Sequence, residues 1–444
     1  MSTNISLKHI NKLAFPALIA GVAEPILSIT DTAIVGNISE NAIESLAAVG
    51  IVGTFISMLI WVLGQTRSAI SSIVSQYVGS GNLDKVKNLP AQAIFIITSL
   101  SLLIILGTYP FADSIFRLYN ASDLILNYSV EYYQIRVFGF PFTLFTIAIF
   151  GTFRGLQNTY YPMIIAIVGA SANIVLDFAF VYGIEGYIPA MNIKGAAYAS
   201  VIAQMLMALI SAYYLLKKTN IPLRFSFPFN KEINRFVIMI LNLFVRTLAL
   251  NVTLYFASSF STSYGKEYIA AYTIAINLWF LGAFIIDGYA SAGNILSGKL
   301  LGGKEYGKLI TLSNILMRYG VILGIIMAVI GALFYNFIGH VFTQEEAVLK
   351  EFENVFWIIL AMQPLCAIAF IFDGMFKGLG KMKVLRNVLL MATFLVFVPI
   401  LFLLDSMDYK LYGIFIAFTV CIIARGLPLI IKFRQEFLPL SEKQ

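Results

Sequence analysis

The chain has 444 residues, of which 59% are hydrophobic and only 12% charged, and its formal net charge is +7. Soluble domains contain about 45–50% apolar and about 25% charged residues, so this composition excludes an ordinary soluble protein. The two cysteines, Cys366 and Cys421, lie in apolar runs and there are two histidines, which argues against a disulfide framework or a zinc site. Because no GxxxxGK[ST] motif occurs, we expect no ATP-driven step and an ion gradient as the energy source.

Apolar runs of about twenty residues recur along the whole chain, separated by Gly, Pro, Asn and charged residues. The sequence therefore predicts an all-α membrane protein with twelve transmembrane helices. In chain order the expected helices are 13–36, 45–78, 91–112, 132–154, 160–184, 193–216, 235–262, 268–300, 311–341, 354–377, 384–404 and 411–433.

Basic residues concentrate in the connections that follow the even-numbered helices. These connections hold Lys85, Lys87, Arg154, Lys217, Lys218, Arg224, Lys231, Lys299, Lys304, Lys308, Lys381, Lys383 and Arg386. The other connections are poor in base, and the one at 342–353 is acidic. The positive-inside rule then predicts a multi-pass protein of the plasma (inner) membrane with both termini cytoplasmic. This asymmetry explains the net charge, so no nucleic-acid partner is expected.

An internal repeat relates the two halves of the chain. RGLQN at 154–158 and KGLGK at 377–381 each follow a proline by thirteen residues, Pro141 and Pro364, and both pairs are 223 residues apart (377 − 154 and 364 − 141). The same offset places SLAAVGI at 45–51 on YIAAYTI at 268–274. We therefore predict two pseudo-symmetric six-helix lobes around a central cavity: 1–218 and 235–444, joined by a cytoplasmic linker at 219–234.

Carboxylates occur inside the predicted spans of the first half, where a charge costs about 2.5–3.5 kcal/mol. Asp31 lies in the first helix, Asp177 lies in the fifth, and Asn173 precedes Asp177 by four residues on the same helix face. At about 1.5 Å per residue, Asp31, Asp177 and Ser200 fall at one depth, roughly 10 Å inside the outer boundary. Such oxygens suit a hard cation or a shared proton. Alternatively, each carboxylate caps a buried hydroxyl or a backbone break.

Several motifs together resemble the multidrug and toxic compound extrusion (MATE) transporters. They are Pro16, DTAIVG at 31–36, RGLQNTYYPM at 154–163, GAAYAS at 195–200 and DGMFKGLG at 373–380, and the first helix looks most like the DinF-like branch. The resemblance implies a secondary active antiporter, not an enzyme, that exports amphipathic and often cationic drugs or toxic metabolites by alternating access. It implies exchange for H⁺ or Na⁺, no cofactor, and a monomer in the lipid bilayer.

The resemblance also implies roles for individual residues. Asp31, Asn173 and Asp177 match the family's cation site, a possible Na⁺ site, and Ser200 stands where the family has threonine. The first helix is expected to bend near Pro16, with Pro25 as a second weak point. Glu24, two turns deeper than Asp31, is expected to face the central cavity or to pair with a cation.

The second half lacks the acidic pattern of the first. The offset places Leu254 at the position of Asp31 and Ile400 at that of Asp177, so the expected cation site exists in one lobe only. Arg246 lies in the helix where the family has a second coupling carboxylate. Asp373 matches a family position in the tenth helix, but a local pair with Lys377 is the alternative that we favour.

Arg67 and Asp287 occupy corresponding helices of the two lobes, because the offset places Asp287 one turn from the position of Arg67. An unpaired charge there would be costly. The sequence thus suggests a gate in which the two residues pair when the cytoplasmic side closes. The alternative is that each bonds to groups within its own lobe.

Other functions remain open at this point. A lipid or lipid-linked oligosaccharide flippase of the same superfamily would need a cavity rich in Lys and Arg, whereas the basic residues expected within the spans are Arg67, Arg246 and Arg425. A membrane-embedded enzyme would need better-placed nucleophiles and bases than this chain offers. A channel would not need the two-lobe repeat.

Overall fold

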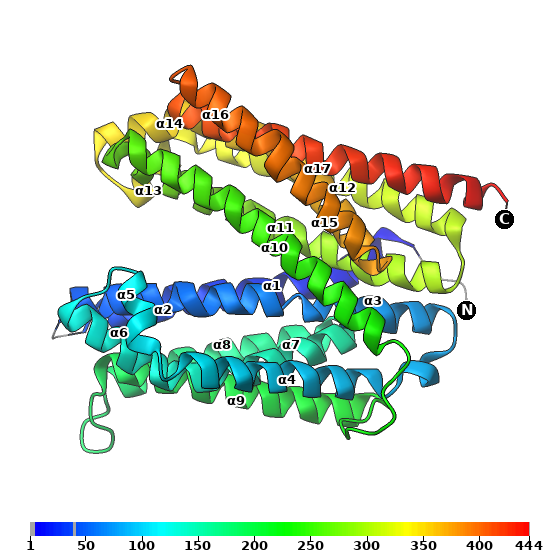
Figure 1. The fold of residues 1–444 in the computed structure, drawn as a ribbon, viewed down its shortest axis with the longest axis horizontal. Coiled ribbons are helices and arrows are strands. Elements are labelled where there is room, and N and C mark those ends of the chain that lie inside the picture. Colours follow the sequence, from blue (N-terminus) through cyan, green and yellow to red (C-terminus); the bar gives the residue numbers. More distant parts are fainter. Residues whose placement is uncertain (1–4, 39–40, 444) are drawn as a thin grey trace. The chain divides into compact units, whose positions relative to one another are not determined.

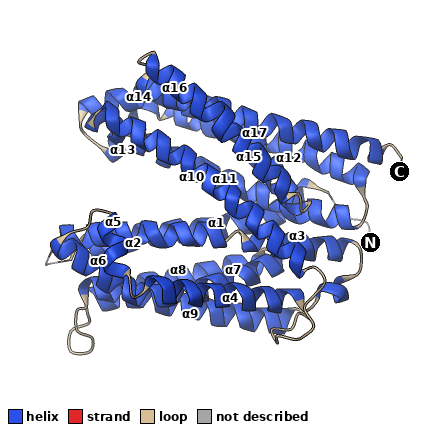
Figure 2. Ribbon diagram, in the orientation of Figure 1, coloured by secondary structure: helices blue, strands red, loops and turns tan. Residues whose placement is uncertain are grey.

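The computed structural model describes residues 5–38 and 41–443, apart from the side chains of residues 23–29. The described residues form helices and contain no strand beyond an isolated bridge between Ile184 and Ile188 (Figures 1 and 2). The α-helices are α1 (Leu7–Val35), α2 (Ala42–Leu63), α3 (Thr66–Gly79), α4 (Leu89–Thr108), α5 (Ala112–Leu118), α6 (Asp123–Arg136), α7 (Phe140–Gly155), α8 (Tyr160–Val181), α9 (Asn192–Lys218), α10 (Ile233–Tyr264), α11 (Lys266–Gly302), α12 (Tyr306–Leu333), α13 (Tyr335–Phe342), α14 (Glu346–Gly378), α15 (Met382–Met391), α16 (Val398–Ser406) and α17 (Lys410–Ser441).

Eleven helical segments of the described chain are long and apolar enough to cross a membrane. Helix α1 is a further candidate, because its 29 residues extend about 43 Å. In lipid every backbone N–H and C=O must be satisfied within the protein, which a helix achieves by itself. The predicted all-α, twelve-helix membrane fold is confirmed.

Several predicted helix boundaries are wrong. The helix expected at 45–78 is divided into α2 and α3, because the hydroxyl of Thr66 donates to the carbonyl oxygen of Leu63 (2.5 Å) and a turn forms at Gly64 and Gln65. The acidic stretch expected in a connection before residue 354 instead forms the first turns of α14 from Glu346. That stretch contains no Gly or Pro, so the helix continues beyond the apolar run.

The chain divides into two compact units. We call Ile19–Val74 with Asn82–Val237 the first unit, and Met1–Leu18, Ser75–Gly81 and Ile238–Gln444 the second unit. In the first unit, α8 packs against α9, α7 against α4 and α9, and α2 against α6. In the second unit, α14 packs against α11, α12 and α17 around buried aromatic side chains that include Phe352, Phe356 and Phe415. The lobe boundaries at residues 218 and 235 remain a prediction.

The two units repeat the same close helix contacts 223 residues apart. A Cβ atom on Gly151 of α7 would lie 2.6 Å from the carbonyl oxygen of Arg67, and one on Gly374 would lie 2.1 Å from that of Ala290 (151 + 223 and 67 + 223). Both positions therefore require glycine.

One turn further on, the same relationship holds. A Cβ atom on Gly155 would meet the side chain of Val74, and one on Gly378 would meet that of Ser297 (155 + 223 and 74 + 223). The helix contacts thus follow the offset that the sequence predicts.

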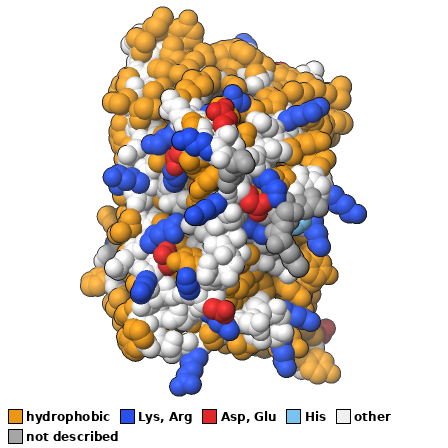
Figure 3. Space-filling model, turned by 90° about the vertical axis from the view of Figure 1, so that its right-hand side faces the viewer, with side chains coloured by type: hydrophobic (Ala, Val, Ile, Leu, Met, Phe, Trp, Pro, Cys, Tyr) orange, Lys and Arg blue, Asp and Glu red, His pale blue; other side chains and the backbone are white. Residues whose placement is uncertain are grey.

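Figure 3 shows the end of the molecule at which the chain's C-terminus lies in Figure 1. Lys and Arg side chains are spread across this face, and hydrophobic side chains lie along its borders. This distribution fits the basic connections that the positive-inside argument uses.

Candidate ion and substrate site

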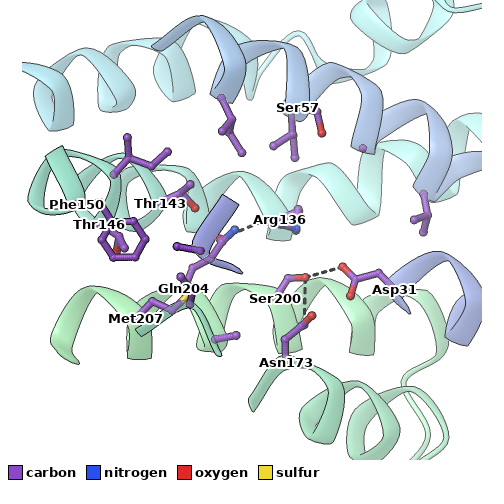
Figure 4. Close-up of a pocket in the computed structure, with 18 of the residues that line it drawn as sticks. Asp31, Ser57, Arg136, Thr143, Thr146, Phe150, Asn173, Ser200, Gln204 and Met207 are labelled. Atoms are coloured by element: carbon purple, nitrogen blue, oxygen red, sulfur yellow. Dashed lines mark hydrogen bonds between the residues drawn. The ribbon is translucent and has the colours of Figure 1, made fainter. Parts of the chain in front are cut away.

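A pocket lies among the helices of the first unit, with an empty volume of about 1170 Å³ including its mouth. Its polar side chains are Asp31, Arg67, Arg136, Asn173, Ser200 and Gln204. Its apolar wall includes Ile56, Ile60, Ile147, Phe150 and Met207. In Figure 4, Asp31, Ser200 and Asn173 lie at one end of the pocket, and Phe150, Thr146 and Met207 lie toward the other.

A hydrogen-bonded chain joins three residues of the expected cation site. The hydroxyl of Ser200 on α9 donates to Oδ2 of Asp31 on α1 (3.0 Å), and Nδ2 of Asn173 on α8 donates to Oγ of Ser200 (3.5 Å) (Figure 4). All three side chains are buried. Three helices that are far apart in sequence thus bring their polar groups to one point.

Asp177 lies one turn from Asn173 on the buried face of α8, and its carboxylate interacts electrostatically with that of Asp31. Four buried oxygens of this group have no hydrogen-bond partner among the described residues: Asp31 Oδ1, Asn173 Oδ1 and both carboxylate oxygens of Asp177. Leaving such acceptors unsatisfied costs about 1–3 kcal/mol each, and more when they are charged. The donor set of oxygens therefore fits a proton or a hard cation such as Na⁺.

Arg136 and Gln204 are site residues that the sequence reasoning missed. Nη1 of Arg136 donates to Oε1 of Gln204 (2.9 Å), and both side chains line the pocket (Figure 4). The set of arginines expected within the spans omitted Arg136, although it lies inside the predicted helix 132–154. Gln204 follows Ser200 by four residues on α9, a spacing that places both on one helix face.

Arg67 lies in the first turn of α3, and its side chain lines the same pocket. Its Nε is buried and has no hydrogen-bond partner among the described residues. Asp287 lies on α11 in the second unit, where its charge acts on Arg246 and Lys377. The gate between Arg67 and Asp287 stays a prediction.

The second unit surrounds its one buried carboxylate with cations. Oδ1 of Asp373 pairs with Nη2 of Arg246 (2.6 Å) and Nη2 of Arg425 (3.0 Å), and Oδ2 pairs with Nζ of Lys377 (3.1 Å). The local pair with Lys377 is therefore present, but it is one of three. Because both oxygens are already paired, this carboxylate offers less to a coupling ion than Asp31 and Asp177 do.

The remaining expected positions lie on α1. Pro16 is half-buried within this helix. Glu24 and Pro25 belong to α1, but their side chains lie outside the described part of the structure. Bending of the helix at Pro16 or Pro25 and the role of Glu24 stay predictions. Among the described residues, no group of three or more His, Cys, Asp or Glu side chains could hold a metal ion.

The MatE family model matches the chain twice, at residues 16–179 and at residues 239–403. The two matches begin 223 residues apart (239 − 16), which is the offset of the internal repeat. The chain belongs to the MatE family. MatE proteins are transporters, and this MatE chain is a multi-pass membrane protein.

Relatives of this MatE protein cover most of its length. It is 25% identical over 431 residues to the DNA damage-inducible protein F of Escherichia coli, with 96% of this chain and 91% of the relative covered. It is 25% identical over 416 residues to the multidrug resistance protein NorM of Aliivibrio fischeri, with 90% and 86% covered. It is 24% identical over 468 residues to Protein DETOXIFICATION 42 of Arabidopsis thaliana, with 93% and 88% covered.

Solved MATE structures share the fold. The crystal structure of a MATE protein in its bent conformation matches with a TM-score of 0.90 at 21% identity, covering 98% of this chain and 96% of the other. An outward-facing MATE family transporter matches with a TM-score of 0.85 at 22% identity, covering 98% and 96%.

Proposed function

We propose that this protein is a multidrug efflux antiporter that exports amphipathic, often cationic compounds in exchange for H⁺ or Na⁺. The observation that carries the proposal is the group of four buried oxygens without partners on Asp31, Asn173 and Asp177, beside a pocket with an apolar wall. Similarity to the multidrug resistance protein NorM and to the multidrug export protein MepA of Staphylococcus aureus supports efflux as the activity.

The geometry suggests how ion and substrate are coupled. Asp31 lines the pocket and interacts with the more deeply placed Asp177, so a proton or cation held by the pair changes the charge that a bound substrate meets. A cationic compound binds best when the carboxylates are free, and an arriving ion weakens its hold. Alternating access then needs the substrate to leave on the outer side when the ion enters there.

The two units divide this work unequally. In the first unit the carboxylates have free oxygens, whereas in the second unit Asp373 is neutralised by Arg246, Arg425 and Lys377. We therefore propose that coupling passes through the first unit alone. The basic connections support cytoplasmic termini in the plasma (inner) membrane, and cysteine labelling at each terminus of the intact protein tests that orientation.

The efflux proposal is tested with ethidium in everted vesicles that contain the full-length protein. We expect ethidium transport to stop when one gradient, H⁺ or Na⁺, is collapsed and to continue when the other is collapsed. Transport that survives the loss of both gradients would contradict the antiport proposal. Movement of lipid-linked oligosaccharide without ethidium transport would instead support the flippase alternative.

A further inference from the structure

Arg67 has no binding partner in its own unit although it lies in a membrane-spanning segment and lines the pocket. Its Nε is buried, and no hydrogen bond or ion pair to its side chain is formed within the described part of the first unit. A guanidinium carries five donors and is always charged, so an unpaired one inside a membrane protein is costly. Such a group is expected to meet an acceptor at some stage of the protein's working cycle.

The other charged groups of the pocket already have partners. Arg136 donates to Gln204 (2.9 Å), and Asp31 accepts from Ser200 (3.0 Å). Arg67 is therefore the charged pocket side chain, among the described residues, that is left to bind an incoming molecule.

Helix α7 gives the distance between the two polar ends of the pocket. A Cβ atom on Gly139, just before α7, would lie 3.4 Å from Nη1 of Arg136, and one on Gly151 would lie 2.9 Å from Cα of Arg67. Twelve residues separate these glycines (151 − 139), a rise of about 18 Å. Between them, Thr143, Thr146, Ile147 and Phe150 line the pocket. The pocket thus has a polar cluster at one end, a guanidinium at the other, and an apolar wall between.

We propose that Arg67 binds a carboxylate of the transported compound while the compound's apolar body lies along Ile147 and Phe150. The planar guanidinium matches a carboxylate with two parallel hydrogen bonds. One guanidinium balances one negative charge, which favours a carboxylate over a phosphate dianion. A compound that also carries an amine places it toward Asp31, so the preferred substrate is an elongated zwitterion. This inference rests on the proposed efflux function and narrows its substrate class.

Binding to the purified full-length protein in detergent tests the inference with three probes: norfloxacin, which carries both an amine and a carboxylate; its ethyl ester, which lacks the carboxylate; and the cation ethidium. We expect the wild-type protein to bind norfloxacin at least about tenfold more tightly than the ester, as expected for one charge-assisted hydrogen-bonded contact. Arg67→Gln removes this preference, and Arg67→Lys restores part of it. The control Arg117→Gln changes none of the three affinities, because Arg117 is exposed on α5 and pairs with Asp113.

Each other outcome contradicts the inference. Equal wild-type affinities for norfloxacin and its ester would overturn it without any variant, so it does not depend on the folding of Arg67→Gln. Equal weakening of all three probes in Arg67→Gln, reproduced by Asp287→Asn, would assign Arg67 to the gate instead. Ion-driven transport, measured separately in vesicles, decides the efflux proposal, because a protein can prefer the carboxylate and yet fail to export any probe.

Discussion

The hydroxyl of Ser200 donates a hydrogen bond to the carboxylate of Asp31 across 3.0 Å, from α9 to α1. Hydrogen bonds to charged groups are worth about 1.5–3 kcal/mol. We expect Ser200→Ala to weaken ion-driven ethidium efflux about tenfold or more and Ser200→Thr to retain it, with both measured in vesicles at matched protein levels. Ser211→Ala is the control, because the buried Ser211 hydroxyl on the same helix bonds to the carbonyl oxygen of Ala208. Equal loss in both alanine variants would contradict a specific role for Ser200.

Asp177 has two buried carboxylate oxygens without a hydrogen-bond partner among the described residues. Asp177→Asn keeps the shape of the side chain and removes its charge. We expect this variant to be expressed and folded, to bind ethidium, and to lose ion-driven efflux. Asp113→Asn, at an exposed carboxylate on α5, is the matched control and is expected to transport normally. Wild-type efflux by Asp177→Asn would refute the assignment of the cation site.

Asp373 is the shared partner of Arg246, Arg425 and Lys377 in the second unit. Removing one member of a buried ion network leaves uncompensated charge and costs about 3–5 kcal/mol. We expect Asp373→Asn to lower the thermal unfolding midpoint of the purified protein, and the further change Arg246→Gln to recover part of the loss. A midpoint for Asp373→Asn that equals the wild-type value would show that the carboxylate does not hold this cluster together.

Gly151 and Gly374 occupy equivalent close contacts in the two units. Because an added methyl group would lie 2.6 Å and 2.1 Å from a backbone oxygen at these positions, we expect Gly151→Ala and Gly374→Ala each to destabilise the protein by about 1–3 kcal/mol. Gly107 of α4 has no atom within 4 Å of an added Cβ, so Gly107→Ala is expected to leave the thermal midpoint unchanged or slightly raised. Different responses at the two equivalent glycines would contradict the shared packing.

The sequence by itself determined the twelve apolar segments, the helical fold and the 223-residue repeat. These features depend on the length and spacing of apolar runs, because a chain in lipid must satisfy its backbone within each segment. The depth of Asp31, Asp177 and Ser200 also followed from residue counting along helices of known rise. Ends of helices that project beyond the apolar run, such as the start of α14 at Glu346, were predicted less well, because polarity marks the membrane boundary and not the end of a helix.

Only the tertiary structure decided which side chains meet across helices. It paired Arg136 with Gln204, gave Asp373 three cationic partners in place of the single local one, and left Arg67 in the pocket without a partner in its unit. Such contacts depend on how each helix is rotated about its own axis. In a helix that is apolar on most of its faces, the hydrophobic pattern does not define that rotation, so the packing of neighbouring helices does.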